Sequence, residues 1–217
     1  MSARKIFENE LNELNGELVA MCRLTEDMIE SAIDALLRRD RALGRSIKEL
    51  DKRVDEYEMD IEKRCMRILL RRQPVAKDFR KVSTALKMIT DIERFGDQAS
   101  DIGDIVATMP GEKYIKDLHY IKAMGELAVK MVRESVESFI RNDEKLADEI
   151  IRADDKMDDL FLSVKNELVA LIGQDAKNGD QAIELMMIAK YLERIGDHAV
   201  NVAEWTKYNE TGVHLKF

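Results

Sequence analysis

The chain has 217 residues, of which 45% are hydrophobic and 36% are charged, and it contains only 10 glycines and 2 prolines. This composition favours long amphipathic helices over strands and tight turns. The formal net charge of −8 argues against a general nucleic-acid binder, which normally presents a basic surface, and suits cations and basic partner surfaces.

Three helices are predicted in the first half of the chain. The first spans about residues 4–38, because apolar side chains recur there at alternating steps of three and four, as in a helix that packs on other helices. Asp40 then offers an N-cap for a second helix over about 41–72. Pro74 ends that helix and suits the first turn of a third, over about 75–108.

The second half repeats this plan after a chain break at Pro110-Gly111. Helices are predicted over about 115–141, 144–173 and 181–208, and Asp180 can cap the last of them. Similar residues recur about 100 positions apart, which indicates an internal duplication.

The sequence therefore predicts an all-α protein, built as a tandem duplication of an antiparallel three-helix bundle with six long helices. The first unit would comprise residues 1–110 and the second residues 111–217. A helix of about 30 residues would be about 45 Å long.

The cysteines and the apolar segments bear on the compartment. Cys22 and Cys65 are too few for a disulfide framework and are expected to be reduced core residues. The N-terminal residues contain no apolar signal segment, and no run approaches the roughly 18–20 apolar residues that span a bilayer. We therefore expect a cytoplasmic protein that reaches a membrane only through a partner.

An acidic stripe occurs twice, on the third helix of each half. Residues 91–102 read DIERFGDQASDI and residues 191–202 read YLERIGDHAVNV, with Glu, Arg, Gly, Asp and Ala at the same places. Steps of four, four and three residues put the polar side chains of each copy within about 80° of one helix face. These candidate ligands are Glu93, Asp97, Asp101 and Asp104 in the first copy and Glu193, Asp197, Asn201 and Glu204 in the second.

The preceding helix of each half carries a matching pair of acids. Folding the helices back on each other brings Asp51 and Asp55 beside the first stripe, and Asp154 and Asp158 beside the second. Carboxylates gathered at one height repel one another, and a bound cation would remove this cost. We therefore expect a divalent or trivalent metal: oxygen ligands suit Mg²⁺, Ca²⁺, Mn²⁺ and iron, and zinc is less favoured because no Cys or His shares the face.

Other interpretations of these residues stay open. An acidic row on a helix is usually a solvated face, and Arg94 or Arg194 could neutralise a neighbouring carboxylate without a metal. Gly96 and Gly196 each cost about 1 kcal/mol relative to alanine in a helix interior. They are expected to allow either close helix approach or room for a ligand.

These motifs resemble those of a known family. The segment ERIGDHA at 193–199, followed by Asn201 and Glu204, is similar to the signature of the PhoU family of phosphate-uptake regulators. The segment ERFGD at 93–97 resembles its first copy, and QPVAKDFR at 73–80 resembles the family's entry into the third helix. The resemblance extends over essentially the whole chain.

The resemblance implies a cytoplasmic, non-enzymatic regulator that restrains phosphate uptake and the phosphate regulon when phosphate is plentiful. The expected partners are the ATPase subunit of the phosphate ABC transporter and a membrane sensor histidine kinase, and a homodimer is among the expected assemblies. The family binds multinuclear metal clusters through E(D)-x-x-x-D motifs, which fall here on Glu93/Asp97 and Glu193/Asp197. Asp101 departs from the family, which often has Asn there, so the first site is more acidic than is typical.

Two other functions are compatible with acidic helical bundles. A carboxylate-bridged di-metal enzyme needs Glu-x-x-His on two helices, and none of His119, His198 and His214 has a glutamate three residues before it. A metal-free helical adaptor, whose acidic stripes contact a basic partner, is the second alternative.

Overall fold

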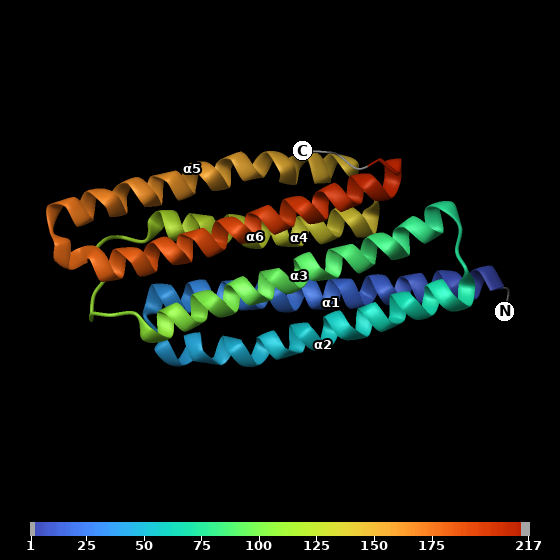
Figure 1. Ribbon diagram of the computed structural model, residues 1–217, viewed down its shortest axis with the longest axis horizontal. Coiled ribbons are helices and arrows are strands. Elements are labelled where there is room, and N and C mark those ends of the chain that lie inside the picture. The colour runs from blue at the N-terminus through green and yellow to red at the C-terminus, as the bar shows by residue number, and fades with distance from the viewer. Residues whose placement is uncertain (1–2, 214–217) are drawn as a thin grey trace.

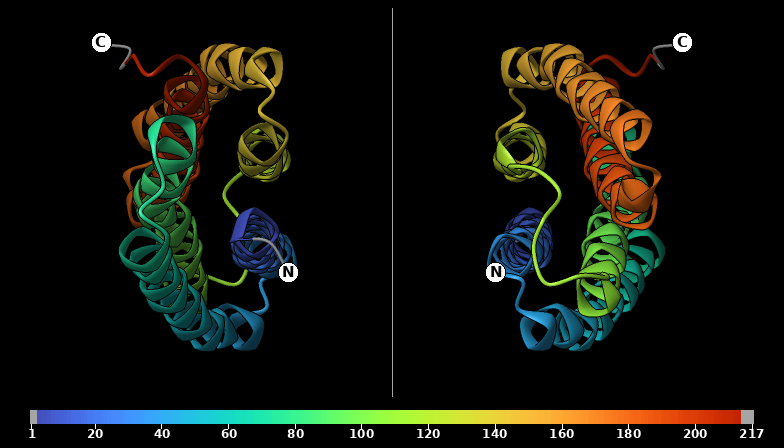
Figure 2. Two further views of the ribbon diagram at one scale, coloured as in Figure 1. Left: turned by 90° about the vertical axis from the view of Figure 1, so that its right-hand side faces the viewer. Right: turned by 90° about the vertical axis from the view of Figure 1, so that its left-hand side faces the viewer.

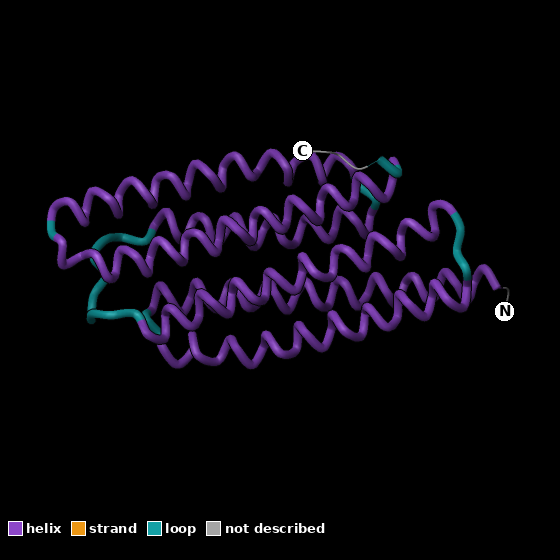
Figure 3. Tube along the Cα trace, in the orientation of Figure 1, coloured by secondary structure: helices purple, strands orange, loops and turns teal. Residues whose placement is uncertain are grey.

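The computed structural model describes residues 3–213 of the chain as helices joined by short connections (Figure 1 and Figure 3). This confirms the predicted all-α tandem bundle of six long helices. The helices are α1 (Ala3–Arg38), α2 (Arg41–Arg72), α3 (Ala76–Thr108), α4 (His119–Arg141), α5 (Glu144–Gln174) and α6 (Gly179–Thr211), with a 3₁₀ turn, η1 (Ala176–Asn178), before α6.

The six helices form two layers. Viewed along the molecule, α2, α3, α6 and α5 follow one another in a curved row, and α1 and α4 lie side by side on its inner face (Figure 2). The helices of each half pack on one another, and the two halves join where α3 meets α6 and α1 meets α4. One hydrophobic core runs through both halves. The predicted division between residues 110 and 111 stays a prediction, because this core is continuous across it.

Aspartate caps start two of the helices. The side chain of Asp40 accepts hydrogen bonds from the backbone N–H groups of Ala42 and Leu43 at the start of α2. The side chain of Asp143 does the same for Lys145 and Leu146 at the start of α5. Each cap satisfies N–H groups that have no partner within their helix, and the Asp40 cap confirms the sequence prediction.

Two helices start close to the predicted positions, about 75 and 181, but the roles predicted for Pro74 and Asp180 are wrong. Pro74 precedes α3 instead of lying in its first turn, because Gln73 closes α2 with a left-handed φ of 46° and the chain stays extended through Val75. Asp180 lies in the first turn of α6 and does not cap it. The aspartate that caps here is Asp175, whose side chain accepts from the N–H of Lys177 in the 3₁₀ turn.

The connection between the halves also differs from the prediction, since α4 starts at His119 instead of about 115. The amide of Gln181 accepts from the N–H of Ile115 at 2.6 Å and donates to the carbonyls of Pro110 and Lys113 at 3.1 and 3.0 Å. On the other side Arg39, at the end of α1, donates to the carbonyls of Pro110 and Gly111 at 3.2 and 2.7 Å. Side chains from both halves therefore hold this connection in a non-helical path.

The structure bears on the expectations about the cysteines and about apolar segments. Cys22 and Cys65 are buried free thiols, as expected. Between residues 3 and 213, no helix combines the length and the apolar character that crossing a bilayer requires.

Small residues set the distance between neighbouring helices. A Cβ atom on Gly44 of α2 would lie 2.7 Å from the backbone oxygen of Gly103 on α3, and one on Gly103 would lie 2.6 Å from the backbone oxygen of Gly44. The two backbones are in direct contact, so neither position has space for a side chain. A Cβ on Gly125 of α4 would lie 2.6 Å from Ile33 of α1, at the junction of the halves.

We predict that Gly44→Ala destabilises the protein, because the added methyl group must push α2 away from α3. The free energy of unfolding should fall by about 1–3 kcal/mol, the usual cost of overpacking. Gly16→Ala is the matched control: nothing lies within 4 Å of its Cβ position on α1, and alanine there should stabilise by up to about 1 kcal/mol. Urea unfolding followed by circular dichroism measures both, and equal stability of the two variants would contradict the packing argument.

Candidate functional site

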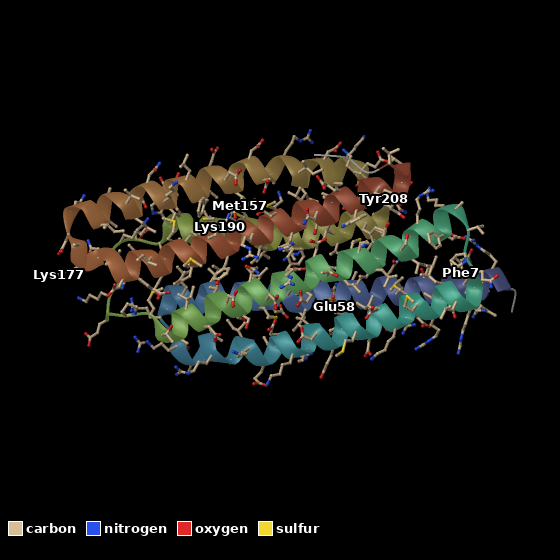
Figure 4. The ribbon with its side chains drawn as sticks, in the orientation of Figure 1. Phe7, Glu58, Met157, Lys177, Lys190 and Tyr208 are labelled. Carbon is tan, nitrogen blue, oxygen red and sulfur yellow. The ribbon has the colours of Figure 1, made fainter. Side chains whose placement is uncertain are left out.

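The two motif helices, α3 and α6, each carry a glycine that lets a carboxylate of the preceding helix lie in the contact between the two helices. A Cβ on Gly96 would lie 3.3 Å from Oδ1 of Asp51, and one on Gly196 would lie 3.5 Å from Oδ1 of Asp154. The other atoms near these positions belong to Val54 of α2 in the first case, and to Met157 of α5 and Met131 of α4 in the second. Figure 4 labels Met157. Both glycines therefore serve close helix approach, and protein side chains take up the freed space.

The first acidic cluster consists of Asp51, Asp55, Glu93 and Asp97. Burial, followed by the charges of Asp97 and Asp55, raises the pKa of Asp51 to about 6. Burial and Asp97 also raise the pKa of Glu93 to about 7, with smaller contributions from Glu58 and Asp55. The predicted convergence of acids from α2 and α3 is therefore present, and it makes the charged forms costly.

The second acidic cluster consists of Asp154, Asp158, Glu193 and Asp197. Burial, and then the charges of Asp197, Asp158 and Glu193, raise the pKa of Asp154 to about 6. The Oδ1 atom of Asp154 is buried and has no hydrogen-bond partner. An unpaired buried carboxylate oxygen is unfavourable, and no described residue donates to this one.

Basic side chains neutralise part of each cluster. Arg94 Nη1 lies 2.6 Å from Asp97 Oδ2, and Arg94 Nε lies 3.4 Å from Glu93 Oε2. In the second cluster the ion pair to Glu193 comes from Lys190, one turn earlier, instead of from Arg194. In this arrangement, no three His, Cys, Asp or Glu side chains among residues 3–213 are placed to hold one metal ion.

The outer stripe positions also have partners outside the clusters. The Tyr191 hydroxyl on α6 hydrogen-bonds to Asp101 on α3. In the mirror position, Asn201 on α6 donates to Asp91 on α3 at 3.1 Å. Asp104 pairs with Lys48 Nζ at 3.5 Å, and Glu204 is half-buried. Asp101 and Asn201 thus mainly join the two motif helices.

Sequence reasoning missed three residues, two at the contact between α3 and α6 and one beside the second acidic cluster. Asp91 Oδ1 lies 2.9 Å from His198 Nδ1 as well as accepting from Asn201. Asp91 and Tyr191 occupy equivalent places, two residues before the motif glutamate, and each faces the other copy of the motif. Lys190 stands three residues before Glu193, a spacing that puts both on one helix face. The positions of these residues relative to the motif glutamates could have been read from the sequence. Which residue each of them contacts depends on how α3 and α6 pack together.

The chain is similar to proteins of a known family over nearly its whole length. A model of the PhoU domain matches residues 18–106 and again residues 121–206. The phosphate-specific transport system accessory protein PhoU homolog of Clostridium acetobutylicum is 35% identical over 210 residues, with 96% of each chain covered. The homolog of the same name from Pseudomonas aeruginosa is 33% identical, over 97% of this chain and 87% of its own.

Solved structures share the fold. The crystal structure of PhoU from Pseudomonas aeruginosa matches with a TM-score of 0.90 at 32% identity, covering 95% of this chain and 100% of that one. The phosphate transport system regulatory protein PhoU from Streptococcus pneumoniae also gives 0.90, at 24% identity, and covers 97% and 100% of the two chains. At the lower identity, the likeness shows the fold alone.

The raised pKa values predict that metal-free protein loses stability as the pH rises. The pKa of Asp51 increases from an ordinary 3.8 to about 6 on folding, and that of Glu93 from 4.5 to about 7. Between about pH 4 and 7 the folded state therefore binds more protons than the unfolded state, and these groups stabilise the fold least above pH 7.

Asp51→Asn removes one of these charges. In the presence of a chelator it should raise the melting temperature at pH 7.5, and the gain should shrink at pH 5, where the Asp51 carboxyl of the parent protein is largely protonated. Glu56→Gln, at an exposed position on the same helix, is the control. A gain of the same size at both pH values would show that charge repulsion is not the cause.

Proposed function

The chain belongs to the PhoU family, and from this premise we propose that it is an accessory protein of a phosphate-specific transport system. The observation that carries the proposal is the repeated match of the family domain to both halves, together with similarity over nearly the whole length to relatives that bear this name.

We further propose that the protein is a negative regulator that acts in the cytoplasm without catalysing a reaction. It would restrain phosphate uptake and the phosphate regulon by contacting the transporter ATPase subunit and a sensor histidine kinase, as a monomer or a homodimer. A non-enzymatic role agrees with the description of the relatives as accessory proteins. A di-metal enzyme is the less supported alternative, because the histidines lack the Glu-x-x-His spacing.

We propose that each acidic cluster takes up a hard cation. Asp51, Asp55, Glu93 and Asp97 would hold the first, and Asp154, Asp158, Glu193 and Asp197 the second. The support is the donor chemistry: all donors are oxygens, which suit Mg²⁺, Ca²⁺, Mn²⁺ or iron better than zinc. The raised pKa values of Asp51, Glu93 and Asp154 mark places where added positive charge would be favourable.

Uptake of a cation would require two basic side chains to move. The side chain of Arg94 is 48% exposed and that of Lys190 is 44% exposed, so both can turn into solvent without disturbing the core. The cation would then replace them as the positive charge beside Glu93 and Glu193. The outer stripe positions would orient the motif helices and would not complete the first coordination sphere of the cation. These positions are Asp101, Asp104, Asn201 and Glu204.

Removing one motif aspartate from each cluster tests the metal proposal. Asp97→Ala combined with Asp197→Ala should abolish metal binding, measured by elemental analysis after dialysis against Mn²⁺ or Fe²⁺, and should leave the helical circular dichroism unchanged. Asp60→Ala with Asp159→Ala, at exposed positions on α2 and α5, should retain the metal. Loss of helicity in the first double variant would instead assign the two aspartates a structural role.

Deleting the gene for this protein tests the regulatory proposal. In cells grown with abundant phosphate, phosphate-scavenging genes should become expressed, because the restraint on the sensor kinase is lost. The transcripts can be measured directly, and unchanged expression would remove the assignment. Rescue by an Asp97→Ala, Asp197→Ala protein that carries no metal would favour the metal-free adaptor over the metal-binding regulator.

A further inference from the structure

The two hairpin ends of the duplication expose similar apolar surface at opposite ends of the molecule (Figure 1). The α2–α3 end, residues 66–79, lies near the N-terminus, and the α5–α6 end, residues 169–187, lies at the far end, where Figure 4 labels Lys177. The exposed apolar residues of the first are Met66 at 47%, Leu70 at 72%, Val75 at 77% and Phe79 at 49%. Those of the second are Val169 at 60%, Ile172 at 38%, Ile183 at 60% and Met187 at 40%.

The two ends differ in charge. Residues 66–79 contain four basic residues and one acidic residue, whereas residues 169–187 contain one basic and three acidic residues. The basic end is unusual in a chain with a net charge of −8. The duplication therefore provides an internal comparison, in which apolar exposure is shared and positive charge is not.

Two arginines of the α2–α3 end, Arg67 and Arg71, are exposed and form no ion pair with any described residue. The pKa of Glu10 is lowered by its hydrogen bond with Arg72 and, at longer range, by the charge of Arg71. By contrast, Arg72 pairs with Glu10 at 2.7 Å and Lys77 with Glu210 at 3.0 Å. Arginine in the last turn of a helix is favourable beside the helix dipole, which accounts for Arg71. It does not account for Arg67, or for the neighbouring apolar side chains that extend into solvent.

We propose that the α2–α3 end contacts an anionic lipid surface. Met66, Leu70, Val75 and Phe79 would enter the boundary between headgroups and acyl chains, and Arg67 and Arg71 would lie among the lipid phosphates. The apolar side chains surround a connection of only three residues at a projecting end of the molecule. The apolar side chains suit the acyl region at such an interface, and the positive charge of the flanking arginines is complementary to anionic headgroups.

This inference goes beyond the proposed regulatory function and differs from the expectation that any membrane contact is made through a partner. An accessory protein that touches the bilayer directly would search for a transporter or sensor in two dimensions. The α5–α6 end, with its acidic residues, would be repelled by the same surface and would face away from it.

Vesicle co-sedimentation tests the proposal. Purified full-length protein is mixed with vesicles of phosphatidylglycerol and phosphatidylcholine, or of phosphatidylcholine alone, and the bound fraction is measured after centrifugation. The parent protein should bind the anionic vesicles only. Arg67→Ala with Arg71→Ala should lower the partition coefficient about 30-fold, as expected for two cationic side chains near the surface. Leu70→Ser with Val75→Ser should lower it about tenfold.

The matched control is Val169→Ser with Ile183→Ser at the α5–α6 end, which should bind as the parent does. All substituted side chains are exposed, so circular dichroism should show unchanged folding. Absence of binding to anionic vesicles overturns the proposal, as does equal loss of binding in the control variant. Retention on an immobilised polyglutamate peptide without vesicle binding would assign this end to an acidic protein and would also overturn it. None of these outcomes depends on whether the deletion changes gene expression.

Discussion

The contact of a partly buried aspartate with a helix glycine is the constraint on which both acidic clusters depend. Gly96 and Gly196 remove a side chain from the motif helix, so the preceding helix approaches closely and carries Asp51 or Asp154 into the seam. Burial there disfavours the carboxylate, and the neighbouring acids add repulsion. The fold compensates with positive charge at the rim, from Arg94 in one half and Lys190 in the other. A bound cation would serve the same purpose with a higher charge density.

The duplication makes the two clusters alike in geometry but not in detail. The motif helices meet each other through crossed polar contacts, Tyr191 with Asp101 and Asp91 with Asn201 and His198. Each contact links a residue just before one motif to the other motif or its outer positions. A shift of α3 or α6 would therefore alter contacts made by the other helix. At Asp101 the partner is the Tyr191 hydroxyl, which donates to its carboxylate.

Much of the fold was predictable because it depends on local patterns. Apolar periodicity predicts six helices. The cap at Asp40 was predictable because its side chain bonds only to N–H groups two and three residues further along the chain. The acids on α2 and α5 were predictable because hairpin register follows from helix rise. One error arose where a distant residue decides: Gln181 holds residues near 115 out of a helix from 66 positions away. Another arose because a 3₁₀ turn, capped by Asp175, precedes α6, so Asp180 already lies inside the helix that it was predicted to cap. Lys190 stands three residues before Glu193 and Arg194 directly after it, so the sequence allows either as the counter-ion. The direction of the side chains decides for Lys190.

The connection between the halves has a mechanical consequence. Arg39 from the first half and Gln181 from the second both hold the carbonyl of Pro110, so the connection is anchored to both bundles at one point. Swinging one bundle away from the other about this segment would break these hydrogen bonds and separate the α3–α6 and α1–α4 contacts. A shear along those contacts would keep the helices packed, and it is the relative motion that this architecture favours. In such a shear the two acidic clusters would change their alignment more than their separation.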